Sequence, residues 1–139
     1  MVTIYPMAYT SLKHAEHNKE VCEHLQIDNK YTDWVITTAF YASLHFMRHK
    51  LFPRTLLVKG KSITINTFHE YCDTSGQTSK KHGVLRKLIE SECDSSIAAQ
   101  YNQLMDLSFT ARYSNYQKKP RIGNLAQRRM MTIREYAIS

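Results

Sequence analysis

The chain has 139 residues, of which 42% are hydrophobic, and this suits one domain with one core rather than several domains. Its most apolar stretch, residues 34–47, is interrupted by threonine, serine and histidine, so it cannot supply the roughly 20 apolar residues of a membrane span. The net charge of +7 favours an anionic partner such as RNA.

The amino-terminal residues and the cysteines indicate the compartment. Residues 1–7 lack the charged start and the apolar run of a secretory signal. Cys22, Cys72 and Cys93 are widely spaced and form no Cys-x-x-Cys pair, so neither a disulfide framework nor a zinc knuckle is predicted. We therefore expect a cytoplasmic protein with reduced thiols.

Apolar residues at helical spacing predict two helices in the first 51 residues. The first covers residues 11–25, with Ser11 as its amino-terminal cap. The second covers residues 31–51 and is apolar almost all round, so it should lie at the centre of the fold. Pro53 should end it, because proline cannot continue the helical hydrogen bonds.

An insertion of about residues 53–79 should follow the second helix. Two short β-favouring runs, residues 56–58 and 63–65, flank a turn that contains Gly60, which predicts either a small hairpin or an irregular flap. Residues 73–79 are polar and are expected to form a loop.

The helical pattern returns in the last 60 residues. A third helix should start at Lys80, and a fourth should start after the capping residues 94–96 and end at Pro120. Residues 123–138 form a fifth. The whole chain, residues 1–139, is thus predicted to be a single all-α domain, an antiparallel bundle of four or five helices.

The positive charge is concentrated at the carboxyl end, where the last helix should be basic. Between residues 118 and 139, six cations and one acid give a net +5. The cations are Lys118, Lys119, Arg121, Arg128, Arg129 and Arg134. This segment forms either a solubilising surface or a face that contacts phosphates.

Common catalytic and metal-binding motifs are missing. The sequence has no glycine-rich phosphate loop, no Gly-x-Ser-x-Gly and no His-Glu-x-x-His. His14 with His17, and His45 with His49, have one-turn spacing, but no third ligand is near either pair in sequence. We expect no metal and no cofactor.

Three helices each carry a polar cluster at one-turn spacing. These clusters are Tyr41 with His45, His82 with Arg86, and Ser108 with Arg112 and Tyr116. Either they face one another in a site, or they are hydrogen-bonded core groups and an ordinary cation at a helix end.

The order of these motifs resembles that of HEPN domains, small helical bundles associated with RNA cleavage or with nucleotidyltransferase partners. The resemblance covers residues 33–116. It consists of Asp33-Trp34, then Ala39-Phe40-Tyr41-Ala42-Ser43-Leu44-His45, then His82 to Ile89, then Tyr101, Leu104 and Ala111-Arg112-Tyr113. It implies a homodimer. Nuclease members place a histidine four to six residues after the arginine, where this chain has Gln117, Lys118 and Lys119.

Two RNA-directed hypotheses follow. In the first, the chain is a divergent, metal-independent ribonuclease in which His82 or His45 removes the proton of the ribose 2′-hydroxyl and Arg112 stabilises the charged phosphorane. Tyr41 would orient these groups, and Arg86 would add a second cation.

In the second hypothesis, the chain binds RNA or a nucleotide without cleaving it. Arg112, Asn115, Tyr116, Lys118 and Lys119 would then provide cations and a stacking ring. A third alternative is a non-catalytic assembly subunit, either a homodimer or the protein partner of a toxin or defence system.

Overall fold

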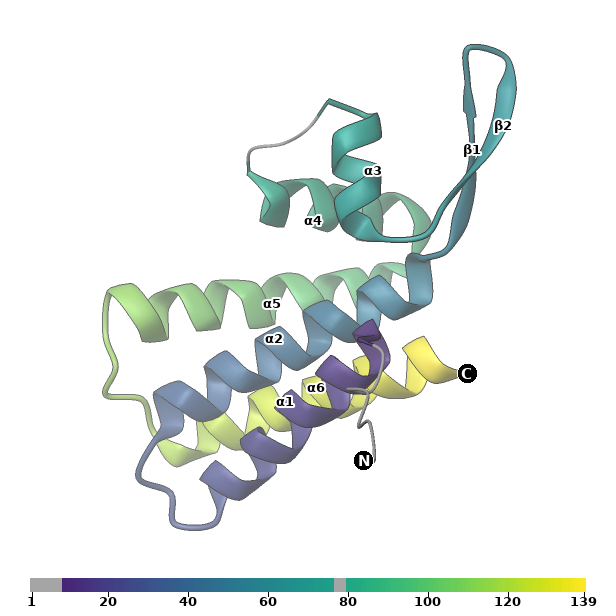
Figure 1. Ribbon diagram of the computed structural model, residues 1–139. Helices are drawn as coiled ribbons and strands as arrows, with labels where there is room; N and C mark the ends of the chain where they lie inside the picture. Colours follow the sequence, from purple (N-terminus) through teal and green to yellow (C-terminus); the bar gives the residue numbers. More distant parts are fainter. Residues whose placement is uncertain (1–8, 77–79) are drawn as a thin grey trace, which may run out of the picture.

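The computed structural model describes residues 9–76 and 80–139 of the chain (Figure 1). These residues form six helices and one two-stranded sheet, so the all-α prediction holds apart from the small sheet. The elements are α1 (Ser11–Gln26), α2 (Thr32–Leu51), β1 (Arg54–Val58), β2 (Lys61–Ile65), α3 (Phe68–Thr74), α4 (Lys81–Glu92), α5 (Ser95–Tyr113) and α6 (Pro120–Ile138).

Helix α2 lies at the centre of the fold, as its apolar sequence predicts. Twelve of its twenty residues are buried. The long helices α1, α5 and α6 pack on it, and α1 and α2 run in opposite directions, as do α5 and α6 (Figure 1). Burial of nearly the whole circumference explains why this helix lacks the polar face of a surface helix.

The starts of α2 and α6 and the end of α1 meet at one end of the molecule. A Cβ atom on Gly123 would lie 3.2 Å from Cγ2 of Thr32, so glycine allows α6 to approach α2 closely. The amide of Gln26 donates to Oδ1 of Asn124 at 3.1 Å and links α1 to α6. These contacts place the α1–α2 turn beside the loop that precedes α6.

The segment after α2 forms a hairpin rather than an irregular flap. Strands β1 and β2 pair antiparallel, with Val58 opposite Lys61, so the turn consists of Lys59 and Gly60. Both turn residues have positive φ angles, 51° and 77°, as the tight hairpin turns that match strand twist require. The hairpin projects from the end of α2 (Figure 1).

The short helix α3 was not expected from the sequence, so the helices number six in the described residues rather than four or five. Thr67 caps α3 by accepting a hydrogen bond from the Glu70 N–H, and the Glu70 carboxylate accepts one from the N–H of Asn66, the residue before the cap. The predicted loop at residues 73–79 is therefore wrong for residues 73 and 74, which end α3. Residues 77–79 lie outside the described residues.

Two predicted helix boundaries also need correction. Thr10, not Ser11, caps α1, because its hydroxyl accepts from the Lys13 N–H at 3.1 Å. Helix α5 ends at Tyr113, and Pro120 begins α6 instead of ending α5. Proline suits the first turn of a helix, where its missing N–H costs no hydrogen bond.

Within the described part of the chain, no helix combines the length and the apolar character that a bilayer crossing requires.

Candidate functional site

Arg112, in the last turn of α5, is held in place by two tyrosines and its own helix. Its Nη1 donates to the hydroxyl of Tyr41 on α2 at 2.8 Å, and its Nε donates to the Ser108 carbonyl at 3.3 Å. The guanidinium carbon lies 5.3 Å from the ring centroid of Tyr41 and 5.0 Å from that of Tyr113. Hydrogen bonds and cation–π contacts thus fix the position of this charge.

His82, in the first turn of α4, lies beside Arg112. Its ring centroid is 6.3 Å from that of Tyr41 and 6.0 Å from that of Phe40. Partial burial, followed by the positive charges of Arg112 and Arg48, lowers the pKa of His82. The imidazole is therefore neutral at pH 7, although the residue remains exposed on one side.

His82 and Arg112 line one cavity of about 290 Å³, and Tyr41 contacts Arg112 without lining the cavity itself. The cavity is lined by Phe40, His82, Met105, Asp106, Phe109 and Arg112. Asp106 and Phe109 were not predicted from the sequence, although their spacing of three residues places both on the face of α5 that carries Arg112. A neutral base, a fixed cation and a carboxylate therefore adjoin one recess.

His45 lies outside this cavity. Its ring stacks on that of His14 with centroids 3.6 Å apart, and only 7% of the residue is exposed. Burial, with smaller contributions from His14 and Arg48, lowers the pKa of His45 to about 3. Its Nδ1 has no hydrogen-bond partner among the described residues. This imidazole is thus a buried neutral group with little access to a substrate.

Arg86 is engaged elsewhere on α4. Its Nε donates to Oε1 of Glu90 at 3.0 Å, and Asn102 donates to the same oxygen at 3.1 Å. The hydrogen bonds from Arg86 and then Asn102 lower the pKa of Glu90. The carboxylate balances the Arg86 charge, and Arg86 does not line the cavity at Arg112.

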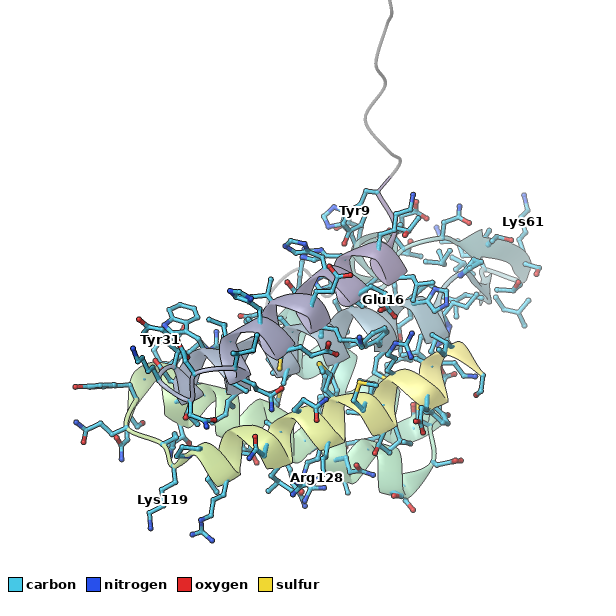
Figure 2. The ribbon with its side chains drawn as sticks, turned by 90° about the horizontal axis from the view of Figure 1, so that it is seen from below. Tyr9, Glu16, Tyr31, Lys61, Lys119 and Arg128 are labelled. Atoms are coloured by element: carbon cyan, nitrogen blue, oxygen red, sulfur yellow. The ribbon has the colours of Figure 1, made fainter. Side chains whose placement is uncertain are left out.

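Asn115, Tyr116, Lys118 and Lys119 lie in the loop between α5 and α6. The Asn115 side-chain oxygen accepts from the Gln117 N–H at 2.9 Å, so this amide shapes the loop. Tyr116 and Lys119 are exposed, and Lys118 is half-buried. Lys119 projects outward at the same end of the molecule as Tyr31 (Figure 2).

Exposed aromatic rings gather around this end. They are Tyr31 and Trp34 at the start of α2, Phe109 and Tyr113 at the end of α5, and Tyr116 in the following loop. We call these five residues the aromatic end. Trp34 is 55% exposed, whereas the sequence places it in a helix expected to be buried all round. The neighbouring residues Thr32, Val35 and Ile36 are buried, so Trp34 lies on the one side of this turn that the other helices leave uncovered, which a local sequence pattern does not show.

Comparison with known proteins gives no relative. No protein-family model, no curated protein and no solved structure matches this chain. Among the residues that the structure describes, no three histidine, cysteine, aspartate or glutamate side chains are grouped to hold a metal ion.

Proposed function

We propose that this chain is a HEPN-like helical bundle that binds single-stranded RNA through Arg112 and the aromatic end. The observation that carries the proposal is the position of Arg112. Its guanidinium is fixed between Tyr41 and Tyr113, beside His82 and next to exposed rings.

The chemistry of the surface matches that of single-stranded RNA. Arginine and lysine bind backbone phosphates, and exposed aromatic rings stack unpaired bases at about 1–3 kcal/mol per base. Here Arg112, Lys118 and Lys119 provide the charge, and Tyr113 and Trp34 provide ring faces. A fixed guanidinium loses little conformational entropy when it binds, which favours a contact at this position.

The HEPN resemblance also favours Arg112 as an RNA contact, and it predicts a homodimer. Its motifs fall on α2, α4 and α5 in the expected order. Nuclease members carry a histidine shortly after the arginine, where this chain has Lys118 in a loop. His82 approaches Arg112 from α4 instead, so the pair of residue types is present but supplied by two helices.

A binding titration tests the proposal. Fluorescently labelled single-stranded RNA is titrated with the wild type and with Arg112→Met, and Arg128→Met serves as the control because it removes one exposed charge from α6. We expect Arg112→Met to weaken binding about 10–100-fold and Arg128→Met to change it less than about threefold. Absence of RNA binding, or equal losses in both variants, would contradict the proposal.

RNA cleavage is the second candidate function, favoured by the neutral imidazole beside Arg112. His82 would take the proton of a ribose 2′-hydroxyl, and that oxygen would attack the adjacent phosphorus. Arg112 would stabilise the negative charge on the phosphorane. The bond to the 5′-oxygen would then break, and water would protonate the leaving oxygen. The buried ring of His45 is not assigned a role in this step.

Cleavage is measured separately from binding. The same labelled RNA is incubated with protein in the presence of chelator, and the products are separated on a gel. His82→Gln should abolish cleavage while changing RNA affinity less than about threefold, because the imidazole acts on the reaction rather than on binding. Intact RNA after incubation with the wild type would exclude this second function and leave the binding proposal standing.

A further inference from the structure

A second cavity lies between the start of α1, the end of α2 and the segment that precedes α3. Its volume is about 290 Å³. Thr10 and Ser11 line one side, and Asn66 and Thr67 line another. Arg48 of α2 also lines it, so hydrogen-bond donors from three segments adjoin one space.

Arg48 is an unbalanced cation in this cavity. Its guanidinium carbon lies 4.7 Å from the ring centroid of Phe68, which holds the group over an aromatic face. Its Nε is buried without a hydrogen-bond partner, and among the described residues Arg48 forms no ion pair. A partly buried charge whose buried Nε lacks a partner is costly, so a complementary ligand would stabilise the fold.

The electrostatics of the cavity favour an anion. None of the described residues that line it is acidic, whereas Arg48 and His49 are basic. Burial lowers the pKa of Arg48, and the Arg48 charge in turn helps to lower the pKa of His14 and of His45. A bound negative charge would oppose each of these shifts.

We propose that this cavity binds a small oxyanion, namely a phosphate ion or the phosphate group of a monoester, with Arg48 as its principal contact. Residues from three segments line the cavity and carry hydrogen-bond donors, which suits a tetrahedral phosphate that can be contacted from several sides. The volume is at the lower limit of typical small-molecule sites, about 300–1,000 Å³, and leaves room for a small organic group against Phe52 and Phe68.

Calorimetry with two probes tests this site. Inorganic phosphate and phenyl phosphate are titrated into the full chain, into Arg48→Met, and into the controls Arg112→Met and Arg128→Met. We expect saturable binding that is at least about tenfold weaker in Arg48→Met and unchanged in both controls, because a hydrogen bond to a charged group contributes about 1.5–3 kcal/mol. Tighter binding of phenyl phosphate identifies a monoester site, and equal binding of both probes identifies a phosphate site.

Three outcomes would overturn the inference. They are phosphate binding that does not saturate, equal phosphate binding in all four proteins, and loss of phosphate binding in Arg112→Met alone. Asn66→Asp gives an independent check, because it puts a carboxylate on the exposed rim and should also weaken both probes. The site is separate from the RNA proposal. Arg48→Met should leave RNA affinity unchanged, and a failure of RNA binding would not affect the phosphate result.

Discussion

Arg112 and Arg48 are partly buried cations whose charges both lower the pKa of His82, yet their surroundings differ. Arg112 donates to the Tyr41 hydroxyl and to its own helix, and exposed rings lie beside it. Arg48 has an unpartnered Nε and lines a cavity that has no acid among its described lining residues. A cation already satisfied by the protein is suited to an extended ligand at the surface. A cation left unsatisfied indicates a small ligand that completes its hydrogen bonds.

Buried polar atoms without hydrogen-bond partners lie near both arginines. In the described structure they include Nδ1 of His45 and the Tyr101 hydroxyl, whose pKa values the Arg48 charge acts to lower, and Oγ of Ser108, whose carbonyl accepts from Arg112. The contrast therefore lies in the two guanidinium groups themselves, because only that of Arg112 donates to the protein within the described residues. It can be tested by substitutions near both arginines, from the largest expected effect to the smallest.

The largest expected effect is a loss of folding stability at low pH that depends on His45. Its folded pKa is about 3 against about 6.5 when unfolded, so the unfolded chain binds the extra proton between these values. Stability is therefore retained above pH 6.5 and falls as the pH drops toward 3. Between pH 7 and pH 4.5 the protonation of this residue should lower the free energy of unfolding by about 2.5 kcal/mol, measured by urea unfolding at both pH values.

His45→Leu should remove that part of the pH dependence, because leucine cannot be protonated. His24→Gln is the matched control, since His24 is an exposed histidine of α1. An unchanged stability difference between the two pH values in His45→Leu would show that His45 is not the buried neutral group described here.

The next effect concerns base stacking at the aromatic end. Trp34→Ala should weaken single-stranded RNA binding about tenfold, because it removes one exposed ring face. Leu57→Ala is the control, since Leu57 is an exposed apolar residue on the projecting hairpin. Equal losses in the two variants, measured by fluorescence anisotropy, would count against stacking at this end.

The smallest effect compares two tyrosine hydroxyls. Tyr41→Phe deletes a hydrogen-bond acceptor used by Arg112 and should destabilise the fold by about 1 kcal/mol. Tyr101→Phe deletes a buried hydroxyl without a protein partner and should leave the fold as stable or about 1 kcal/mol more stable. Thermal unfolding of both variants at pH 7 measures the difference. Equal destabilisation would mean that the Tyr101 hydroxyl is also satisfied.

Helical periodicity was sufficient to predict the long helices and the central place of α2, because the spacing and number of apolar residues in a segment can be read locally from the sequence. The β-favouring runs around Gly60 gave the hairpin as one of two alternatives, beside an irregular flap. The short helix α3 was missed although Glu70 forms hydrogen bonds with both Thr67 and Asn66 at its start. Only two of its residues, Phe68 and Cys72, are buried, which is too few for a clear period.

The candidate site was predicted in part. One-turn spacing predicted that Tyr41 shares a helix face with His45, and Arg112 with Tyr116, but His45 stacks on His14 and Tyr116 lies in the loop beyond the end of α5. The proximity of His82 to Tyr41 and Arg112 depends on how α4 packs on α5. His45 has the same local pattern as His82, and only tertiary packing shows that it stacks on His14. Arg48 resembles an ordinary cation of a helix end in the sequence, and its cavity forms only when α1 and residues 66–68 come together. The HEPN resemblance stays a prediction.

The measurement that tests the central claim most directly is the salt dependence of RNA binding. The association constant of single-stranded RNA is measured over a series of salt concentrations for the wild type, Arg112→Met and Arg48→Met. We expect Arg112→Met to reduce the slope of log K against log salt by about 1, because one phosphate contact is lost, and Arg48→Met to leave it unchanged. A slope that stays the same in Arg112→Met and falls in Arg48→Met would contradict this account of the two arginines.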